Sequence, residues 1–170
     1  MEKKPLENYL GELLLKRHLS LAVAESCTGG LVGHLITNVS GSSQYFLGGV
    51  MVYSDDVKMK LLGVRQLTLE KHGAVSRETV LEMASGVRRA LAADIGAAVS
   101  GIAGPGGGTP EKPVGLTWIG LSAPGLEAAW SFTWPGDRLA VKEQSAEQVL
   151  RLLVDYLMGS LPDQQSAGSD

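Results

Sequence analysis

A serine and a cysteine lie next to each other in the segment Glu25-Ser26-Cys27-Thr28-Gly29-Gly30. The apolar run 19–25 has the length of a buried strand, and the apolar spacing of a helix resumes after it. A strand that passes into a helix ends where open α/β sheets bind their ligands. Ser26 is therefore a candidate nucleophile for acyl transfer. The backbone N–H groups of Thr28, Gly29 and Gly30 are candidate donors to an oxyanion or a phosphate.

Two other interpretations of this segment stay open at the level of sequence. Serine and threonine are preferred at helix N-termini, so Ser26 or Thr28 could act only as a cap. Cys27 could be the nucleophile instead, because a helix N-terminus lowers the pKa of a thiol. Neighbouring residues of a strand face opposite sides of the sheet, so we expect only one of Ser26 and Cys27 to face a ligand.

A serine nucleophile needs a base, and lysine is a better candidate than histidine. None of the three histidines has a neighbourhood that indicates catalysis: His18, His34 and His72. Tyr53 lies near the end of a second apolar run, 48–54, and Lys58 follows on a short helix. If both strands end at the same edge of the sheet, Lys58 reaches Ser26, and Tyr53 can relay or orient the proton.

Lys58 acts as a base only when it is neutral, so its pKa must fall from about 10.4 toward 7–8. Burial lowers the pKa of a lysine, whereas a carboxylate at Asp55 or Asp56 would oppose that change. The alternative is that Lys58 is an ordinary solvated residue of an exposed helix.

A second candidate site is the glycine-rich segment 101–110, which follows the apolar run 95–100. Its backbone N–H groups can converge on an anion, although it matches neither a P-loop nor a dinucleotide-binding fingerprint. Arg138 opens the last predicted helix, and its guanidinium fits a phosphate or a carboxylate, or a surface ion pair. We therefore expect substrate contacts from this segment and from Arg138, with these glycines as candidates: Gly101, Gly104, Gly106, Gly107 and Gly108.

The elements that must position these residues alternate between strands and helices. The chain reads as helix 5–18, strand 19–25, helix 28–38, strand 48–54, helix 58–62, a long helix capped by Ser76, strand 95–100, a hairpin of strands 114–122 and 126–134, and helix 138–157. This order predicts an α/β fold, a three-layer α/β/α single domain with a mixed sheet of about five strands. We expect the domain to cover residues 1–161, and residues 162–170 to form a disordered polar tail.

Composition narrows the class of protein. The 170 residues are 44% hydrophobic and 19% charged, a balance typical of a globular protein. The net charge of -3 lacks the excess of basic residues that is typical of proteins that bind nucleic acid. The single cysteine excludes an internal disulfide and a zinc site of several cysteines. Clustering among the 22 glycines indicates loops that turn sharply or approach a ligand. With no signal core or apolar run that could cross a bilayer, we expect a cytoplasmic protein without metal, cofactor or membrane partner.

The ordered motifs of residues 6–158 resemble those of the C-terminal domain of the competence/damage-inducible protein CinA. The matching stretches are Ala24-Glu25-Ser26-Cys27-Thr28-Gly29-Gly30, Gly49 to Ser54 with Lys58, Leu62-Gly63-Val64, His72-Gly73-Ala74-Val75-Ser76, Ser100 to Gly108, Lys112-Pro113-Val114-Gly115 and Gly136-Asp137-Arg138. This family includes stand-alone nicotinamide-nucleotide amidohydrolases, which are nicotinamide mononucleotide (NMN) deamidases.

The resemblance implies hydrolysis of the NMN carboxamide to nicotinic acid mononucleotide and ammonia. It also implies Ser26 as nucleophile, Lys58 as base with Tyr53 alongside, and a homo-oligomer, a dimer or higher. One departure is Asp55, where the family commonly has asparagine; a carboxylate there could raise the pKa of Lys58. Longer CinA proteins carry a separate N-terminal nucleotide-cleaving domain, for which we expect no room in this chain. The alternative from another class is a non-catalytic nucleotide-binding module that regulates a partner.

Overall fold

The structure, a computed structural model, describes residues 4–164. Most of the tail predicted for residues 162–170 lies outside this range. Its elements run in the order α1 (Leu6–Arg17), β1 (Leu21–Glu25), α2 (Leu31–Thr37), a 3-10 turn (Ser42–Gln44), β2 (Phe46–Met51), α3 (Asp55–Leu62), α4 (Gln66–His72), α5 (Arg77–Ala90), β3 (Ile95–Gly101), β4 (Leu116–Ala123), β5 (Leu126–Thr133) and α6 (Arg138–Met158). None of the helices in 4–164 is both long and apolar enough to cross a bilayer.

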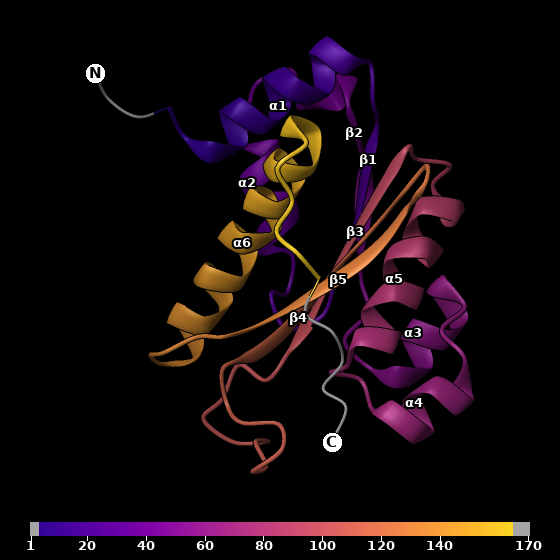
Figure 1. Ribbon diagram of the computed structural model, residues 1–170, viewed down its shortest axis with the longest axis vertical. Coiled ribbons are helices and arrows are strands. Elements are labelled where there is room, and N and C mark those ends of the chain that lie inside the picture. The colour runs from indigo at the N-terminus through magenta and orange to yellow at the C-terminus, as the bar shows by residue number, and fades with distance from the viewer. Residues whose placement is uncertain (1–3, 165–170) are drawn as a thin grey trace.

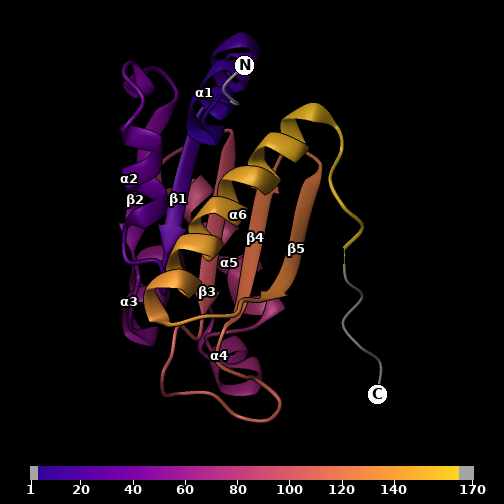
Figure 2. The same cartoon turned by 90° about the vertical axis from the view of Figure 1, so that its left-hand side faces the viewer.

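The described strands form one mixed sheet in the order β2-β1-β3-β4-β5, which Figure 2 shows behind α1, α2 and α6. β1 pairs in parallel with both β2 and β3, while β4 is antiparallel to β3 and to β5. The predicted mixed sheet of five strands is confirmed. Because β1, β2 and β3 are parallel, their carboxyl ends meet at one edge of the sheet, where the candidate residues follow them.

Helices cover both faces of the sheet, as Figure 1 shows. α1, α2 and α6 lie on one face, and α3, α4 and α5 lie on the other. Alternate residues of β1 enter two separate hydrophobic cores: Leu21 and Val23 pack with α6, whereas Ala22 and Ala24 pack with α5. The predicted three-layer α/β/α arrangement is confirmed.

Local signals account for several helix ends. The hydroxyl of Ser76 accepts a hydrogen bond from the N–H of Thr79 and caps α5, as predicted. α2 begins at Leu31 instead of Thr28, because Gly29 and Gly30 adopt left-handed φ angles of 62° and 101°. For α4 the sequence indicates only the end, at His72 before Gly73, and not the start at Gln66.

Part of the glycine content serves close packing of helices instead of loops. A Cβ atom at Gly96 of β3 would lie 2.2 Å from the carbonyl oxygen of Ala84 in α5. A Cβ atom at Gly120 of β4 would lie 2.6 Å from the carbonyl oxygen of Val80 in the same helix. These glycines let α5 approach the sheet closely, a tertiary requirement that composition alone does not reveal.

Candidate active site

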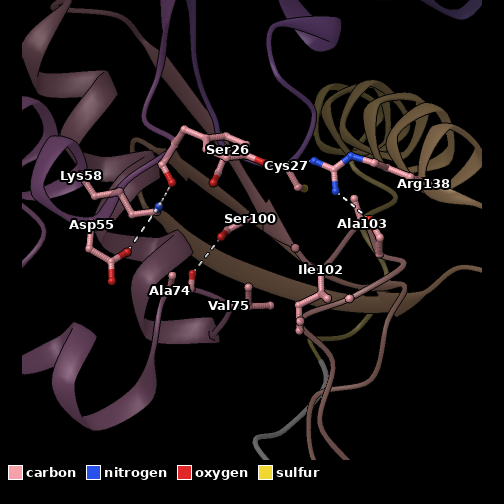
Figure 3. A pocket seen from close by; sticks show the side chains of 15 residues that line it. Ser26, Cys27, Asp55, Lys58, Ala74, Val75, Ser100, Ile102, Ala103 and Arg138 are labelled. Carbon is pink, nitrogen blue, oxygen red and sulfur yellow. Dashed lines mark hydrogen bonds and ion pairs between the residues drawn. The ribbon is translucent and has the colours of Figure 1, made fainter.

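A pocket of about 280 Å³ opens at the carboxyl edge of the parallel strands. Four segments that are distant in sequence line it, together with the first residue of α6. Its lining residues are Ser26, Cys27, Tyr53, Asp55, Lys58, Ala74, Val75, Ser100, Gly101, Ile102, Ala103, Gly104, Gly106, Gly107 and Arg138. Figure 3 shows the side chains of Ser26 and Lys58 reaching into this pocket from different elements. The structure therefore brings together the predicted nucleophile, the predicted base and Tyr53.

Ser26 and Cys27 leave β1 toward opposite faces of the sheet. Ser26 continues the alternation of Ala22 and Ala24 toward α5, and its N–H donates to the carbonyl oxygen of Val99 at 3.0 Å. Cys27 borders the pocket but packs into the core on the α6 side, with only 5% of its surface exposed. Burial raises the pKa of its thiol to about 12. The thiol is therefore neutral near pH 7, which favours Ser26 as the nucleophile.

Lys58 is buried, with 1% of its surface exposed. The interpretation of this lysine as a solvated helix residue is therefore wrong. Its Nζ atom donates to the carbonyl oxygen of Tyr53 at 3.4 Å and lies 3.6 Å from Oδ1 of Asp55. Burial lowers the pKa of Lys58 below its ordinary value, and the nearby carboxylate of Asp55 opposes that decrease.

No hydrogen bond joins the side chains of Ser26 and Lys58 within the described part of the chain. Catalytic hydrogen bonds are often long before substrate binds, so the shared pocket is the relevant observation. Lys58 belongs to α3, and Ser26 continues the alternation of Ala22 and Ala24, so both approach from the face of the sheet that carries α3 and α5.

Tyr53 contacts two candidate residues through different groups. Its backbone carbonyl accepts from Lys58, and its hydroxyl accepts from Nη2 of Arg138 at 2.9 Å. Tyr53 is 65% exposed. Tyr53 thus contacts Lys58 through its main chain, and within residues 4–164 no hydrogen bond links its hydroxyl to Lys58 or Ser26.

Arg138 joins the mouth of the pocket to the glycine-rich segment. Its Nη1 donates to the carbonyl oxygen of Gly104 at 2.7 Å, in addition to the bond to Tyr53. A guanidinium carries five N–H donors, so this exposed side chain retains donors for an anion. The alternative, a surface ion pair of Arg138, is not present among the described residues, where Arg138 bonds to a carbonyl and a hydroxyl.

Sequence reasoning missed the role of Glu25. Its buried carboxylate accepts hydrogen bonds from four donors at the start of α2: the Thr28 hydroxyl at 2.6 Å and the N–H groups of Gly30 at 3.1 Å, Val32 at 3.0 Å and Gly33 at 2.8 Å. The carboxylate thus occupies the anion-binding end of the helix. An acidic residue just before a Ser/Thr-Gly-Gly turn is the signal that could have indicated this cap.

This arrangement corrects the expectation for the predicted oxyanion donors. The N–H of Gly30 and the hydroxyl of Thr28 are bonded to Glu25, and the N–H of Gly29 donates to the carbonyl oxygen of Ser26 at 3.1 Å. These three residues do not line the pocket with Ser26. They border a separate cavity between α2 and α6, beside Lys142.

The glycines of segment 101–108 divide into two groups. Gly101, Gly104, Gly106 and Gly107 line the pocket, whereas Gly108 does not. Close packing explains two of these glycines. A Cβ atom at Gly101 would lie 2.7 Å from Oγ1 of Thr117, and a Cβ atom at Gly108 would lie 2.7 Å from the N atom of Val114. A Cβ atom at Gly106 would have nothing within 4 Å. Gly106 therefore has open space beside it at the edge of the pocket.

The pocket also includes residues that sequence reasoning did not assign. The turn before α5 contributes Ala74 and Val75, and the end of β3 contributes Ser100 and Ile102. The hydroxyl of Ser100 donates to the carbonyl oxygen of Ala74 at 2.8 Å and links the two segments. This contact joins residues 26 positions apart in the sequence, so local patterns did not reveal it.

Comparison with known proteins gives a consistent set of matches. The model of the CinA C-terminal domain matches residues 3–157. A putative competence-damage inducible protein of Moorella thermoacetica is 51% identical over 148 residues, which are 87% of this chain and 36% of that protein. A CinA-like protein of Thermotoga maritima is 48% identical over 155 residues, covering 91% of this chain and 38% of that protein. The chain thus spans little more than a third of these relatives.

Solved structures match over most of both chains. The competence damage-inducible protein A of Klebsiella pneumoniae has a TM-score of 0.87 and 34% identity, covering 90% of this chain and 95% of that one. The competence/damage inducible protein of Agrobacterium tumefaciens has a TM-score of 0.84 and 34% identity, covering 93% of this chain and 99% of that one.

Proposed function

The chain belongs to the CinA C-terminal domain family, and from that premise we propose that it hydrolyses the carboxamide of NMN to nicotinic acid mononucleotide and ammonia. Ser26 is the nucleophile and Lys58 the general base in this proposal. The supporting observation is the buried Lys58, whose pKa is lowered by burial, in the same pocket as Ser26. Where no histidine lies nearby, a lysine with a lowered pKa can take the proton of a serine hydroxyl and activate it as a nucleophile.

The reaction proceeds in two steps with a covalent intermediate. Lys58 takes the proton of the Ser26 hydroxyl, and the serine oxygen bonds to the carboxamide carbon. Lys58 then gives the proton to the departing nitrogen, the C–N bond breaks, and ammonia leaves an ester on Ser26. The same amine then deprotonates a water molecule, whose oxygen attacks the ester carbon. The bond to Ser26 breaks, and Lys58 gives the proton to the Ser26 oxygen.

The oxyanion that forms during each step needs N–H donors. The N–H of Cys27 is the candidate at the pocket, because Cys27 follows the nucleophile and lines the pocket, and this N–H donates to no other described residue. Thr28 does not line the pocket. The N–H of Gly29 would serve only after its bond to the carbonyl oxygen of Ser26 breaks, and the N–H of Gly30 only after its bond to Glu25 breaks.

The rest of the pocket suits an aromatic mononucleotide. Part of the pocket lining is apolar and lies next to the polar side chains of Ser26 and Lys58. It is formed by Val75, Ile102 and Ala103, and it suits a flat heteroaromatic ring. Arg138 at the mouth is the candidate for the phosphate, together with the backbone of Gly104, Gly106 and Gly107.

The second candidate function is a nucleotide-binding module that performs no hydrolysis. The proximity of Asp55 to Lys58 favours this second function. A carboxylate at 3.6 Å stabilises the protonated form of Lys58, which cannot act as a base. Purified protein incubated with NMN and a metal chelator separates the two functions. The amidohydrolase releases ammonia and nicotinic acid mononucleotide in equal amounts. NMN binding in a calorimeter without ammonia release would contradict it and support the binding module.

We also propose that the protein is cytoplasmic and forms a homo-oligomer. The edge strand β2 exposes the apolar side chains of Leu47 and Met51, and Tyr53 follows it. An exposed apolar sheet edge is a surface that proteins commonly cover. Light scattering of the full chain gives its mass in solution.

A further inference from the structure

Ser100 lies beside the proposed nucleophile on the same face of the sheet. β1 and β3 are parallel with Glu25 opposite Val99, and Ser26 donates its N–H to the carbonyl oxygen of Val99. Val99 faces the α6 core and Ala98 the α5 core, so the alternation directs Ser100 toward α5, as it does Ser26. Both serines line the pocket, and Figure 3 shows the Ser100 hydroxyl directed toward Ala74.

Because the Ser100 hydroxyl donates to Ala74, it can only accept any further hydrogen bond. A carbonyl oxygen can only accept, so the single hydroxyl proton of Ser100 is committed to Ala74 at 2.8 Å. Two lone pairs of Oγ remain, and no other described residue donates to them. Ser100 is 1% exposed and lines the pocket, so a further donor to its Oγ has to come from the pocket side.

We infer that Ser100 makes the site selective for a carboxamide over the corresponding carboxylate, an inference that rests on the proposed function. The Oγ atom presents only an acceptor to the pocket. A carboxamide –NH2 can donate to this acceptor, whereas a carboxylate has only acceptors and is repelled. The pocket contains other hydrogen-bond acceptors, which also favour an –NH2 group over a carboxylate. They are the carbonyl oxygens of Tyr53 and Ala74 and the carboxylate of Asp55.

This selectivity has a consequence for turnover. The substrate and the product differ at one group, in which –NH2 is replaced by a negatively charged oxygen. An acceptor beside the reacting carbon therefore stabilises bound substrate and weakens bound product, which favours product release. A site built to hydrogen-bond an N–H discriminates strongly against a ligand that lacks it.

The alternative for Ser100 is a purely structural role, namely anchoring the turn 73–76. Thr79 provides the matched control, because its hydroxyl also anchors this turn, donating to the carbonyl oxygen of Gly73 at 2.7 Å. Thr79 does not line the pocket. Thr79→Val removes this hydroxyl and keeps the branched shape, so it weakens the turn without changing the polarity of the pocket.

The experiment measures dissociation constants for NMN and for nicotinic acid mononucleotide by calorimetry. It uses a Ser26→Ala background, in which bound NMN is not hydrolysed. We expect Ser100→Ala to reduce the preference for NMN over the acid about tenfold, the effect of one hydrogen bond to a desolvated partner. Thr79→Val should leave this preference within about twofold. An unchanged preference in Ser100→Ala, or an equal change in Thr79→Val, would overturn the inference.

Ammonia release by the unmodified protein is measured in parallel, so that two failures can be told apart. If ammonia is released but Ser100→Ala keeps the full preference for NMN, only the role of Ser100 is wrong. If the unmodified protein releases no ammonia from NMN, the proposed function and the role of Ser100 are both wrong.

Discussion

The ammonium of Lys58 lies 3.6 Å from the carboxylate of Asp55, one turn earlier in α3. The two residues differ in exposure, because Lys58 is buried whereas the Asp55 side chain is 57% exposed. Burial lowers the pKa of Lys58, and Asp55 raises it. The balance of these two effects sets the pH at which the lysine is neutral and able to act as a base.

Asp55→Asn is expected to move the acidic limb of the pH profile of kcat/KM toward lower pH. Removing the carboxylate lowers the pKa of Lys58, so the neutral amine persists at a more acidic pH. Ammonia release measured across the pH range tests this shift. Asp56→Asn is the control, since Asp56 shares the first turn of α3 but makes no ion pair with Lys58. A limb that stays in place, or moves toward higher pH, would argue against Lys58 as the base.

Cys27→Ala is expected to retain most of the ammonia-releasing activity. With a pKa of about 12, only about one thiol in ten thousand is ionised at pH 8. The native thiol should accordingly react slowly with iodoacetamide at that pH in the folded protein and quickly after unfolding. Loss of activity in Cys27→Ala as large as in Ser26→Ala would assign the nucleophile to the cysteine.

Local patterns are sufficient for the parallel strands and for the residues that follow them. The apolar runs located β1, β2 and β3, and parallel pairing then brought Ser26, Tyr53 and Lys58 to one edge. The alternation rule also separated Ser26 from Cys27. These features depend on spacing along the chain, which the sequence displays directly.

Contacts that depend on the direction of a side chain or on the packing of distant segments were not predictable in the same way. The cap at the start of α2 depends on the side chain of Glu25 turning back onto the helix. The bond from Ser100 to Ala74 depends on the packing of α5 against β3. Gly101 resembles a residue that binds an anion, but the nearby Thr117 of β4 already explains the absence of a side chain.

Glu25→Gln is expected to lower the free energy of unfolding by about 1–3 kcal/mol, the cost of one unsatisfied buried donor. The glutamine oxygen can keep the donors of Oε2, but its –NH2 then faces the N–H of Gly33. Urea denaturation followed by circular dichroism measures the change. Glu147→Gln, which affects only an exposed pair with Arg151, should change stability by less than about 0.5 kcal/mol. Equal stabilities of the two variants would contradict the role of Glu25 as a cap.

Arg138→Ala is expected to raise KM for NMN about 10–100-fold, which corresponds to the loss of a charged hydrogen bond to the phosphate. The same variant should change KM little for nicotinamide riboside, which has no phosphate. A similar increase for both substrates would mean that Arg138 shapes the pocket through Gly104 and Tyr53 instead of binding the phosphate.

The most direct test of the account is the rate of ammonia release from NMN by Ser26→Ala, compared with the unmodified protein at equal thermal stability. The Ser26 hydroxyl supplies the bonding oxygen, so its removal should reduce the rate by roughly a thousandfold or more. A Ser26→Ala protein that releases ammonia at a rate within tenfold of the unmodified protein would contradict the assignment of Ser26 as the nucleophile.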